Sequence, residues 1–157
     1  MIAALLALTL ASSPPTPNDP VAAAEAVIDR MHAAAARADG PAYFALFTPD
    51  ARFIGTDATE RWTLEQFKAY AEPHFSRGQG WTYRAHDRVA TLAPGDCRCI
   101  VWFDELLDND AYGLTRGSGV LRLTDDGWKI EQYVLSMPIP NDTARAVVDL
   151  IQAEPAR

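Results

Sequence analysis

YGLTRGSGVLRLTDDGWKIEQYVLSM, residues 112–137, carries the strongest fold signal in the chain. The alternation of apolar and polar residues over 112–124 and over 128–137 predicts two strands. Between them stands Asp125-Asp126-Gly127, and an Asp-Gly pair is typical of a tight β-hairpin turn. We therefore expect an antiparallel hairpin at this point of the chain.

The first strand of the hairpin has a face that bears glycine. Gly117 and Gly119 share this face with Leu121, and it must be the inner face because Arg122 has to point to water. Two inward glycines remove side-chain volume, which either bends the sheet or leaves room for a ligand. The same alternation directs Arg116 outward unless a bulge intervenes.

The second strand allows two registers. Trp128 and Ile130 are expected inside, and continued alternation would then bury Gln132. A bulge would bury Tyr133 instead. A buried Tyr133 is either a core aromatic with a hydrated hydroxyl group or an acid catalyst.

Helices and further strands precede the hairpin. The predicted order is α-α-β-α-β-β-β-β-α, with helices over 21–38, 41–47 and 63–73, strands over 51–55, 81–92, 97–107, 112–124 and 128–137, and a last helix from about residue 141. The first helix should bury one apolar stripe, which comprises Ala24, Val27, Ile28, Met31 and Ala35. This order predicts an α+β domain with helices on one face of an antiparallel sheet.

The composition is that of a globular domain. Of the 157 residues, 48% are hydrophobic and 22% are charged, and the formal net charge is −7. A negative charge disfavours nucleic acid and anionic lipid as partners, because both select clustered cations. The sequence has no nucleophile elbow, no glycine-rich phosphate loop and no zinc-ligand spacing, so we expect neither a cofactor nor a metal.

The N-terminus raises a question of targeting. Residues 2–11 form an apolar run followed by Ser12-Ser13-Pro14. Ten helical residues span only about 15 Å, so no membrane span is expected, whereas a short apolar run followed by small residues is typical of a signal peptide. We expect a signal peptide and linker over 1–20, a domain over 21–157, and a periplasmic or secreted protein. If the run is only an N-terminal tail, the protein is cytoplasmic.

Four stretches in this order resemble the SnoaL-like domains of bacteria, which belong to the nuclear transport factor 2-like superfamily. They are FIGTDATERW (53–62), WFDE (102–105), RGSGV (116–120) and WKIEQYVLS (128–136). The resemblance covers about residues 21–141 and implies a cone-shaped α+β barrel, in which a curved sheet wraps around the N-terminal helices and leaves a pocket at the wide end. Such domains include ketosteroid isomerase, polyketide cyclases, dehydratases and binding proteins without catalysis, so the fold leaves the function open.

The resemblance to ketosteroid isomerase implies roles for specific positions. The base of that enzyme is an aspartate just after the first strand, and Asp57 lies about two residues beyond the matching place. Its oxyanion hole uses a first-helix tyrosine, where this chain has Met31-His32-Ala33, and a protonated aspartate, where this chain has Gly119. Because both oxyanion-hole groups are absent, steroid-type isomerisation is not expected.

Asp57 and His74 are the candidate catalytic residues. Asp57 lies in a loop between a strand and a helix, where its carboxylate either bonds its own loop or Arg61, or serves a pocket as base or ligand acceptor. His74 follows Pro73 at a helix end, where it is either a general base or a surface histidine.

Five residues are candidates for ligand binding. Trp62, Trp81 and Tyr133 would form apolar pocket walls. Asp104 interrupts an apolar strand, and a buried aspartate needs a partner or a raised pKa. Arg116, on the neighbouring strand, is the expected partner, in a pair that is either structural alone or also binds a ligand.

Cys97 and Cys99 are the two cysteines of the chain. On a strand, residues two apart point the same way but diverge, so a disulfide between them is not expected. They are interpreted as small buried apolar residues, with a redox or metal-binding pair as the alternative.

Three functions are consistent with the sequence. The first is binding of a small hydrophobic ligand of the carbonyl type by a dimeric SnoaL-like domain. The second is an isomerase, cyclase or dehydratase that uses Asp57 or His74 as general base. The third is a protein-interaction module that presents its sheet face.

Overall fold

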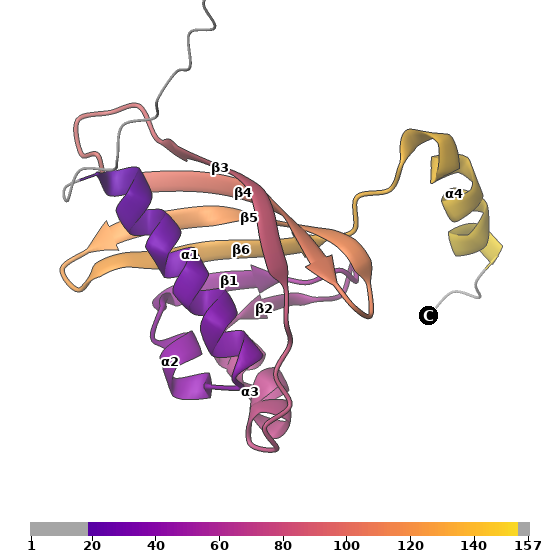
Figure 1. Cartoon of the computed structure of the whole chain (residues 1–157), viewed down its shortest axis with the longest axis horizontal. Helices are drawn as coiled ribbons and strands as arrows, with labels where there is room; N and C mark the ends of the chain where they lie inside the picture. The colour runs from indigo at the N-terminus through magenta and orange to yellow at the C-terminus, as the bar shows by residue number, and fades with distance from the viewer. Residues whose placement is uncertain (1–18, 154–157) are drawn as a thin grey trace, which may run out of the picture.

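The computed structural model describes residues 19–153, in which helices cover one face of a curved six-stranded sheet (Figure 1). The elements in chain order are α1 (Pro20–Ala36), α2 (Gly40–Phe44), β1 (Phe47–Ile54), β2 (Arg61–Thr63), α3 (Leu64–Phe75), β3 (Arg84–Leu92), β4 (Ile100–Asn109), β5 (Gly113–Thr124), β6 (Gly127–Ser136), the 3-10 turn η1 (Asn141–Thr143) and α4 (Ala144–Ala153). The strands lie in the order β2-β1-β6-β5-β4-β3. The α+β class and the succession of helices and strands predicted from the sequence are confirmed.

The sheet differs from the prediction in two details. A short strand, β2, pairs antiparallel with β1 and had not been predicted, because three residues are too few for an alternation to be recognised. In addition, β1 pairs with β6 in parallel, so the sheet is mixed. This pairing joins segments from opposite ends of the domain, and no local pattern indicates it.

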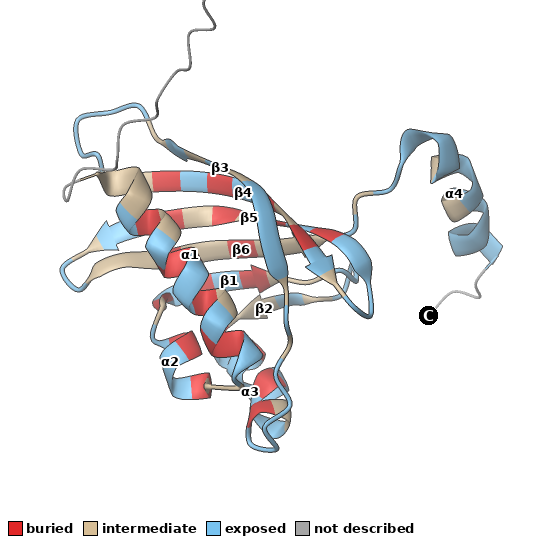
Figure 2. Cartoon of the chain, viewed as in Figure 1, coloured by how far each residue is buried: buried red, intermediate tan, exposed pale blue. Residues whose placement is uncertain are grey.

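The core forms where α1 lies across the inner face of the sheet (Figure 2). The predicted apolar stripe of α1 is buried throughout, with Ala24, Val27, Ile28, Met31 and Ala35 each at most 2% exposed. Asp19 caps the helix by accepting a hydrogen bond from the Val21 N–H, and Pro20 occupies its first turn. The helix therefore begins at a defined point and presents one stripe to the strands.

A bulge in β6 decides the register that the sequence left open. Val120 pairs with Gln132 but the next residue, Leu121, pairs with Ile130, so Glu131 is an extra residue in the strand. The extra residue places Ile130 and Tyr133 on the same inner face, where both are buried. Tyr133 is thus an interior residue.

The two glycines of β5 do face inward as predicted, and each makes room for a neighbouring group. A Cβ atom at Gly119 would lie 2.9 Å from the Phe103 ring and would meet the backbone carbonyl of Gln132. A Cβ atom at Gly117 would lie 2.6 Å from the Tyr133 hydroxyl. Gly119 therefore permits close strand and core packing, and Gly117 permits the position of Tyr133.

The expectation for the cysteines is wrong. Cys97 and Cys99 form a disulfide in the turn before β4, and Cys97 is exposed to solvent. The pair does not lie on a strand: the intervening Arg98 has a left-handed backbone conformation (φ 46°), which lets the flanking side chains converge.

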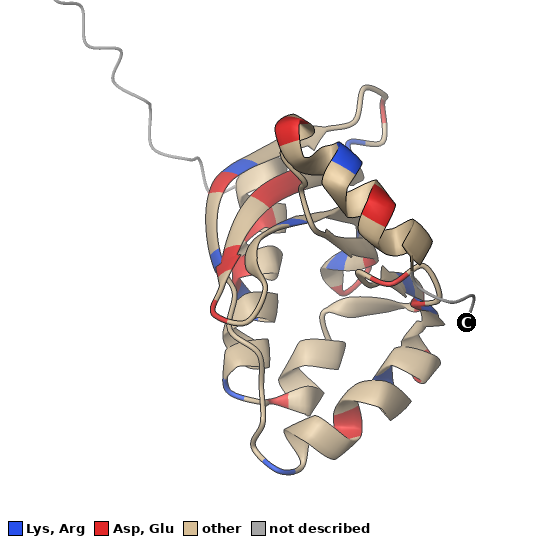
Figure 3. Cartoon of the chain, turned by 90° about the vertical axis from the view of Figure 1, so that its right-hand side faces the viewer, with Lys and Arg blue, Asp and Glu red and all other residues tan. Residues whose placement is uncertain are grey.

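The helix α4 extends away from the rest of the domain (Figure 1). None of its residues is buried, and Ile151 is 66% exposed. Lys and Arg positions are scattered among Asp and Glu positions over the strands, turns and α4 (Figure 3). Within residues 19–153, no helix is long and apolar enough to span a bilayer. Of the predicted signal peptide and linker over 1–20, residues 1–18 lie outside the described part of the chain.

Candidate functional site

A cavity of about 190 Å³ opens on the helical side of the sheet. Residues from α1, α2, α3, β1, β2 and β6 line it, together with the segment before β3 and the turn between β4 and β5. Most of the lining is aromatic: Tyr43, Phe53, Trp62, Phe67, Tyr70, Trp81, Tyr83, Tyr112 and Tyr133. His32 from α1 and Glu60 are its ionisable residues other than tyrosine.

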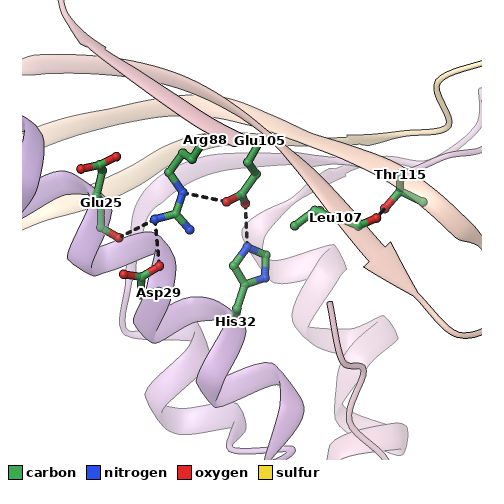
Figure 4. Close-up of polar contacts among 7 residues, drawn as sticks. All are labelled: Glu25, Asp29, His32, Arg88, Glu105, Leu107 and Thr115. Carbon is green, nitrogen blue, oxygen red and sulfur yellow. Dashed lines mark hydrogen bonds and ion pairs between the residues drawn. The ribbon is translucent and has the colours of Figure 1, made fainter. Parts of the chain in front are cut away.

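A buried carboxylate lies behind His32. Glu105 of β4 is fully buried, and its Oε1 atom lies 2.6 Å from His32 Nε2 (Figure 4). Its other oxygen, Oε2, accepts a hydrogen bond of 2.7 Å from Arg88 Nε. Both oxygens of the carboxylate are therefore bonded, one to a residue that lines the cavity and one to a guanidinium group.

Arg88 reaches Glu105 because β3 contains a bulge. Asp87 and Arg88 together oppose Glu105 of β4, and Asp87 adopts a left-handed conformation (φ 49°). The bulge turns Arg88 toward α1, where its Nη1 atom lies 2.8 Å from Asp29 Oδ1 and 3.5 Å from the Glu25 carbonyl oxygen. Burial lowers the pKa of Arg88, but Glu105 and Asp29 outweigh this effect and raise it, so the guanidinium stays charged.

The hydrogen bond to Glu105 fixes the His32 ring. Since a carboxylate accepts, His32 Nε2 carries the proton of this bond and Nδ1 is the nitrogen left to accept one. The second ring nitrogen lies on the side of the ring away from Arg88 (Figure 4). With 12% of its side chain exposed, His32 borders the cavity while its partner is sealed from water.

Tyr133 shares this end of the cavity. Its ring lies edge-on to His32, with the centroids 6.5 Å apart. Burial, followed by the negative charge of Glu105, raises the pKa of Tyr133 well above its usual range. The phenol therefore remains a hydrogen-bond donor at any physiological pH.

Three of the residues predicted to bind a ligand come together in this cavity. Trp62 of β2, Trp81 before β3 and Tyr133 of β6 all line it. The Phe67 ring stacks on Trp62 at 5.6 Å and lies 6.3 Å from Trp81. Phe53 stacks between Phe67 and Tyr133. Their role in binding stays a prediction.

The two candidate catalytic residues lie elsewhere. Asp57 is exposed in the loop between β1 and β2, and its Oδ1 atom accepts hydrogen bonds from the backbone and hydroxyl of Thr59. His74 lies in the last turn of α3, against the ring of Tyr70. Neither is among the residues that line the cavity.

The expectation of a buried pair between Asp104 and Arg116 is wrong. Both side chains lie exposed on the outer face of the sheet, and Asp104 stands opposite Ser118, not Arg116. The prediction assigned alternate residues of β4 to the wrong faces of the sheet. The strand buries Val101, Phe103, Glu105 and Leu107, so Glu105 is the charged residue that faces inward.

Sequence reasoning therefore missed His32, Glu105 and Arg88. Two signals were present. Glu105 has the same parity as its buried neighbours in β4, and His32 lies one helical turn after Ile28, next to the apolar stripe. For Arg88 the signal is ambiguous: it alternates with the inward Ala90 and Leu92, whereas alternation continued from Ala85 directs it outward.

The Arg88→Met substitution should lower the free energy of unfolding by about 3–5 kcal/mol, because it leaves the buried Glu105 charge without its cation. Arg122→Met is the matched control. It removes a partly exposed pair with Glu131 and should cost about 1 kcal/mol or less. Urea denaturation measures both, and equal losses would contradict the account. Replacing Arg88 and Glu105 together by Met should recover part of the loss, since no buried charge remains.

Comparisons with known proteins agree with the fold. The chain resembles a cystatin-like domain of unknown function from Nostoc punctiforme (17% identity, TM-score 0.68, 89% of this chain and 90% of that one). It also resembles a cystatin-like fold protein from Burkholderia xenovorans (26%, 0.62, 79% and 96%) and a ketosteroid isomerase-like protein from Erwinia carotovora (21%, 0.57, 78% and 99%). These likenesses support the fold.

No curated protein matches the chain by sequence. Within residues 19–153, no group of three metal-ligating side chains is present. The model of the SnoaL-like domain matches residues 24–140, from the first helix to the end of the sheet. The chain belongs to the SnoaL-like domain family.

Proposed function

We propose that the cavity binds a small carbonyl compound and that His32, held by Glu105, removes a proton from the carbon next to the carbonyl. The observation that carries this proposal is the 2.6 Å contact between His32 Nε2 and a carboxylate with no solvent exposure, at the wall of an aromatic cavity. Proton removal of this kind is common to isomerases, cyclases and dehydratases.

The geometry supports His32 as the base. The bond to Glu105 holds the proton on Nε2, so Nδ1 can accept a proton from a ligand. The imidazolium that then forms lies against the Glu105 carboxylate, which stabilises it. Arg88 donates a hydrogen bond to this carboxylate and holds it in place.

Tyr133 supplies the complementary acid. Removing a proton next to a carbonyl places negative charge on its oxygen, and a hydrogen-bond donor aimed at that oxygen lowers the barrier. The Tyr133 phenol is protonated, lines the same cavity and lies beside His32. Trp62 and Trp81 would hold the apolar body of the ligand and exclude water.

The His32→Gln variant should lose this activity. With 2-indanone in D₂O, the wild-type protein should accelerate exchange of the hydrogens next to the carbonyl, as followed by proton NMR. Loss of a positioned base typically costs about 10²–10⁴-fold in rate, so we expect a decrease of at least about 100-fold in the variant. Binding of 2-indanone should persist, because the aromatic walls are unchanged.

The other two histidines of the chain provide matched controls. His86 lies exposed on β3 between Asp87 and Asp108, and His86→Gln should exchange at the wild-type rate. His74→Gln tests the base predicted from the sequence. Loss of exchange in His74→Gln with full activity in His32→Gln would overturn the assignment, and binding without exchange in the wild type would reduce the function to binding.

We also propose that the domain forms a homodimer through the outer face of the sheet. This face carries exposed apolar side chains, with Trp102 at 43% and Val89 at 60% exposure, and no helix of residues 19–153 covers it. A self-complementary patch with exposed apolar side chains favours a two-fold contact. Light scattering should give twice the chain mass for the wild type and the single-chain mass for Trp102→Asp. A monomeric wild type at micromolar concentration would contradict the proposal.

We infer that the protein is exported. The apolar run at 2–11 motivates this, and the disulfide between Cys97 and Cys99 supports it, because disulfides persist mainly in oxidising compartments. Fractionation of the native host and N-terminal sequencing should give a periplasmic or secreted protein that begins near residues 12–20. Cytoplasmic protein that retains Met1 would refute export.

A further inference from the structure

Every tyrosine of the chain lines the same cavity. The sequence contains five tyrosines, Tyr43, Tyr70, Tyr83, Tyr112 and Tyr133, and all five are lining residues. They come from α2, α3, the segment before β3, the turn between β4 and β5, and β6. These segments are far apart in the sequence and differ in secondary structure. What their tyrosines have in common is that they line the cavity.

The phenol groups lie near one another. Burial, followed by the proximity of Tyr112 and Tyr70, raises the pKa of Tyr83 to about 12. The hydroxyl of Tyr83 in turn contributes to the raised pKa of Tyr133. Tyr83 lines the cavity together with the buried Tyr133 and with two half-exposed tyrosines, Tyr70 and Tyr112.

These hydroxyls are not used by the protein. Tyr43 and Tyr133 are 2% and 3% exposed, and within residues 19–153 no hydrogen bond joins a tyrosine hydroxyl to another protein group. Neither hydroxyl oxygen is among the fully buried unpaired side-chain atoms of residues 19–153, so both reach accessible space. The cavity thus offers several protonated donors to whatever occupies it.

The cavity also limits the charge and the size of the occupant. No lysine or arginine is among its lining residues, and Glu60 is. A carboxylate or phosphate would meet no cation there, so a neutral ligand is favoured. A cavity of about 150 Å³ accepts benzene, so 190 Å³ suits one ring or two small fused rings.

We propose that the ligand is a neutral compound of one or two rings with an oxygen acceptor at each end, and that Tyr83 donates a hydrogen bond to the outer oxygen. The inner oxygen is the carbonyl that faces His32 and Tyr133, so this part rests on the proposed function. Tyr83 is then a specificity-determining residue, and it takes no part in proton transfer.

Two neutral probes test this assignment. In 2-indanone the carbonyl is the sole oxygen, whereas 5-methoxy-2-indanone carries a second acceptor at the opposite end. One hydrogen bond typically changes affinity severalfold, so calorimetry should show the methoxy compound binding about fivefold more tightly to the wild type. The anionic 2-indanone-5-carboxylate should bind at least about tenfold more weakly than 2-indanone.

The Tyr83→Phe variant should lose the preference for the methoxy compound and keep its affinity for 2-indanone. Thr82→Val is the matched control: it deletes the hydroxyl of the neighbouring residue, which is exposed and does not line the cavity, and should retain the preference. Circular dichroism confirms that both variants are folded.

The binding and exchange measurements separate the role of Tyr83 from that of His32. A wild type that binds both neutral probes equally, or a Tyr83→Phe variant that keeps the preference, would overturn the role of Tyr83, while exchange of 2-indanone by His32 would still uphold the proposed function. Tight binding of the carboxylate would overturn the assignment of a neutral ligand. Failure of the wild type to bind or exchange either ketone would overturn both proposals together.

Discussion

The carboxylate of Glu105, buried in the middle of β4, needs partners from two other elements of the fold. A charge removed from water is tolerated only where partners satisfy it. Arg88 meets one oxygen and His32 the other, and Arg88 also binds Asp29 of α1 (Figure 4). These contacts hold α1 against β3 and β4. They also set a histidine of defined orientation at the wall of the cavity.

Two bulges aim the polar residues of the site. In β3, one extra residue turns Arg88 inward to Glu105, and in β6 the extra residue Glu131 turns Tyr133 inward beside Gly117. Strict alternation continued from Ala85 in β3 and from Ile130 in β6 would direct both side chains to the outer face of the sheet. The two bulges of the sheet thus direct Arg88 and Tyr133 toward the site, and bulges commonly redirect side chains in this way.

Local patterns in the sequence were sufficient for every element except β2 and for part of the cavity lining. The Asp126-Gly127 hairpin, the α1 stripe and the burial of Gly117 follow from turn chemistry and periodicity, and Trp62 and Trp81 do line the cavity. The errors arise where distant segments meet. The sequence offered no means to pair β1 with β6, to detect the bulge at Arg88, or to see that five scattered tyrosines converge. Asp104 in place of Glu105 was a one-residue error of parity, which exchanges the two faces of a strand.

In the proposed mechanism, Glu105 holds the His32 proton on Nε2 and leaves Nδ1 as the base. A long-range ¹H–¹⁵N NMR spectrum of the folded protein reports the tautomer of each histidine directly. The account predicts that neutral His32 carries its proton on Nε2, and that Glu105→Gln weakens this preference. A neutral His32 protonated on Nδ1 in the wild type would contradict the account, because Nδ1 could not then accept a proton from a ligand.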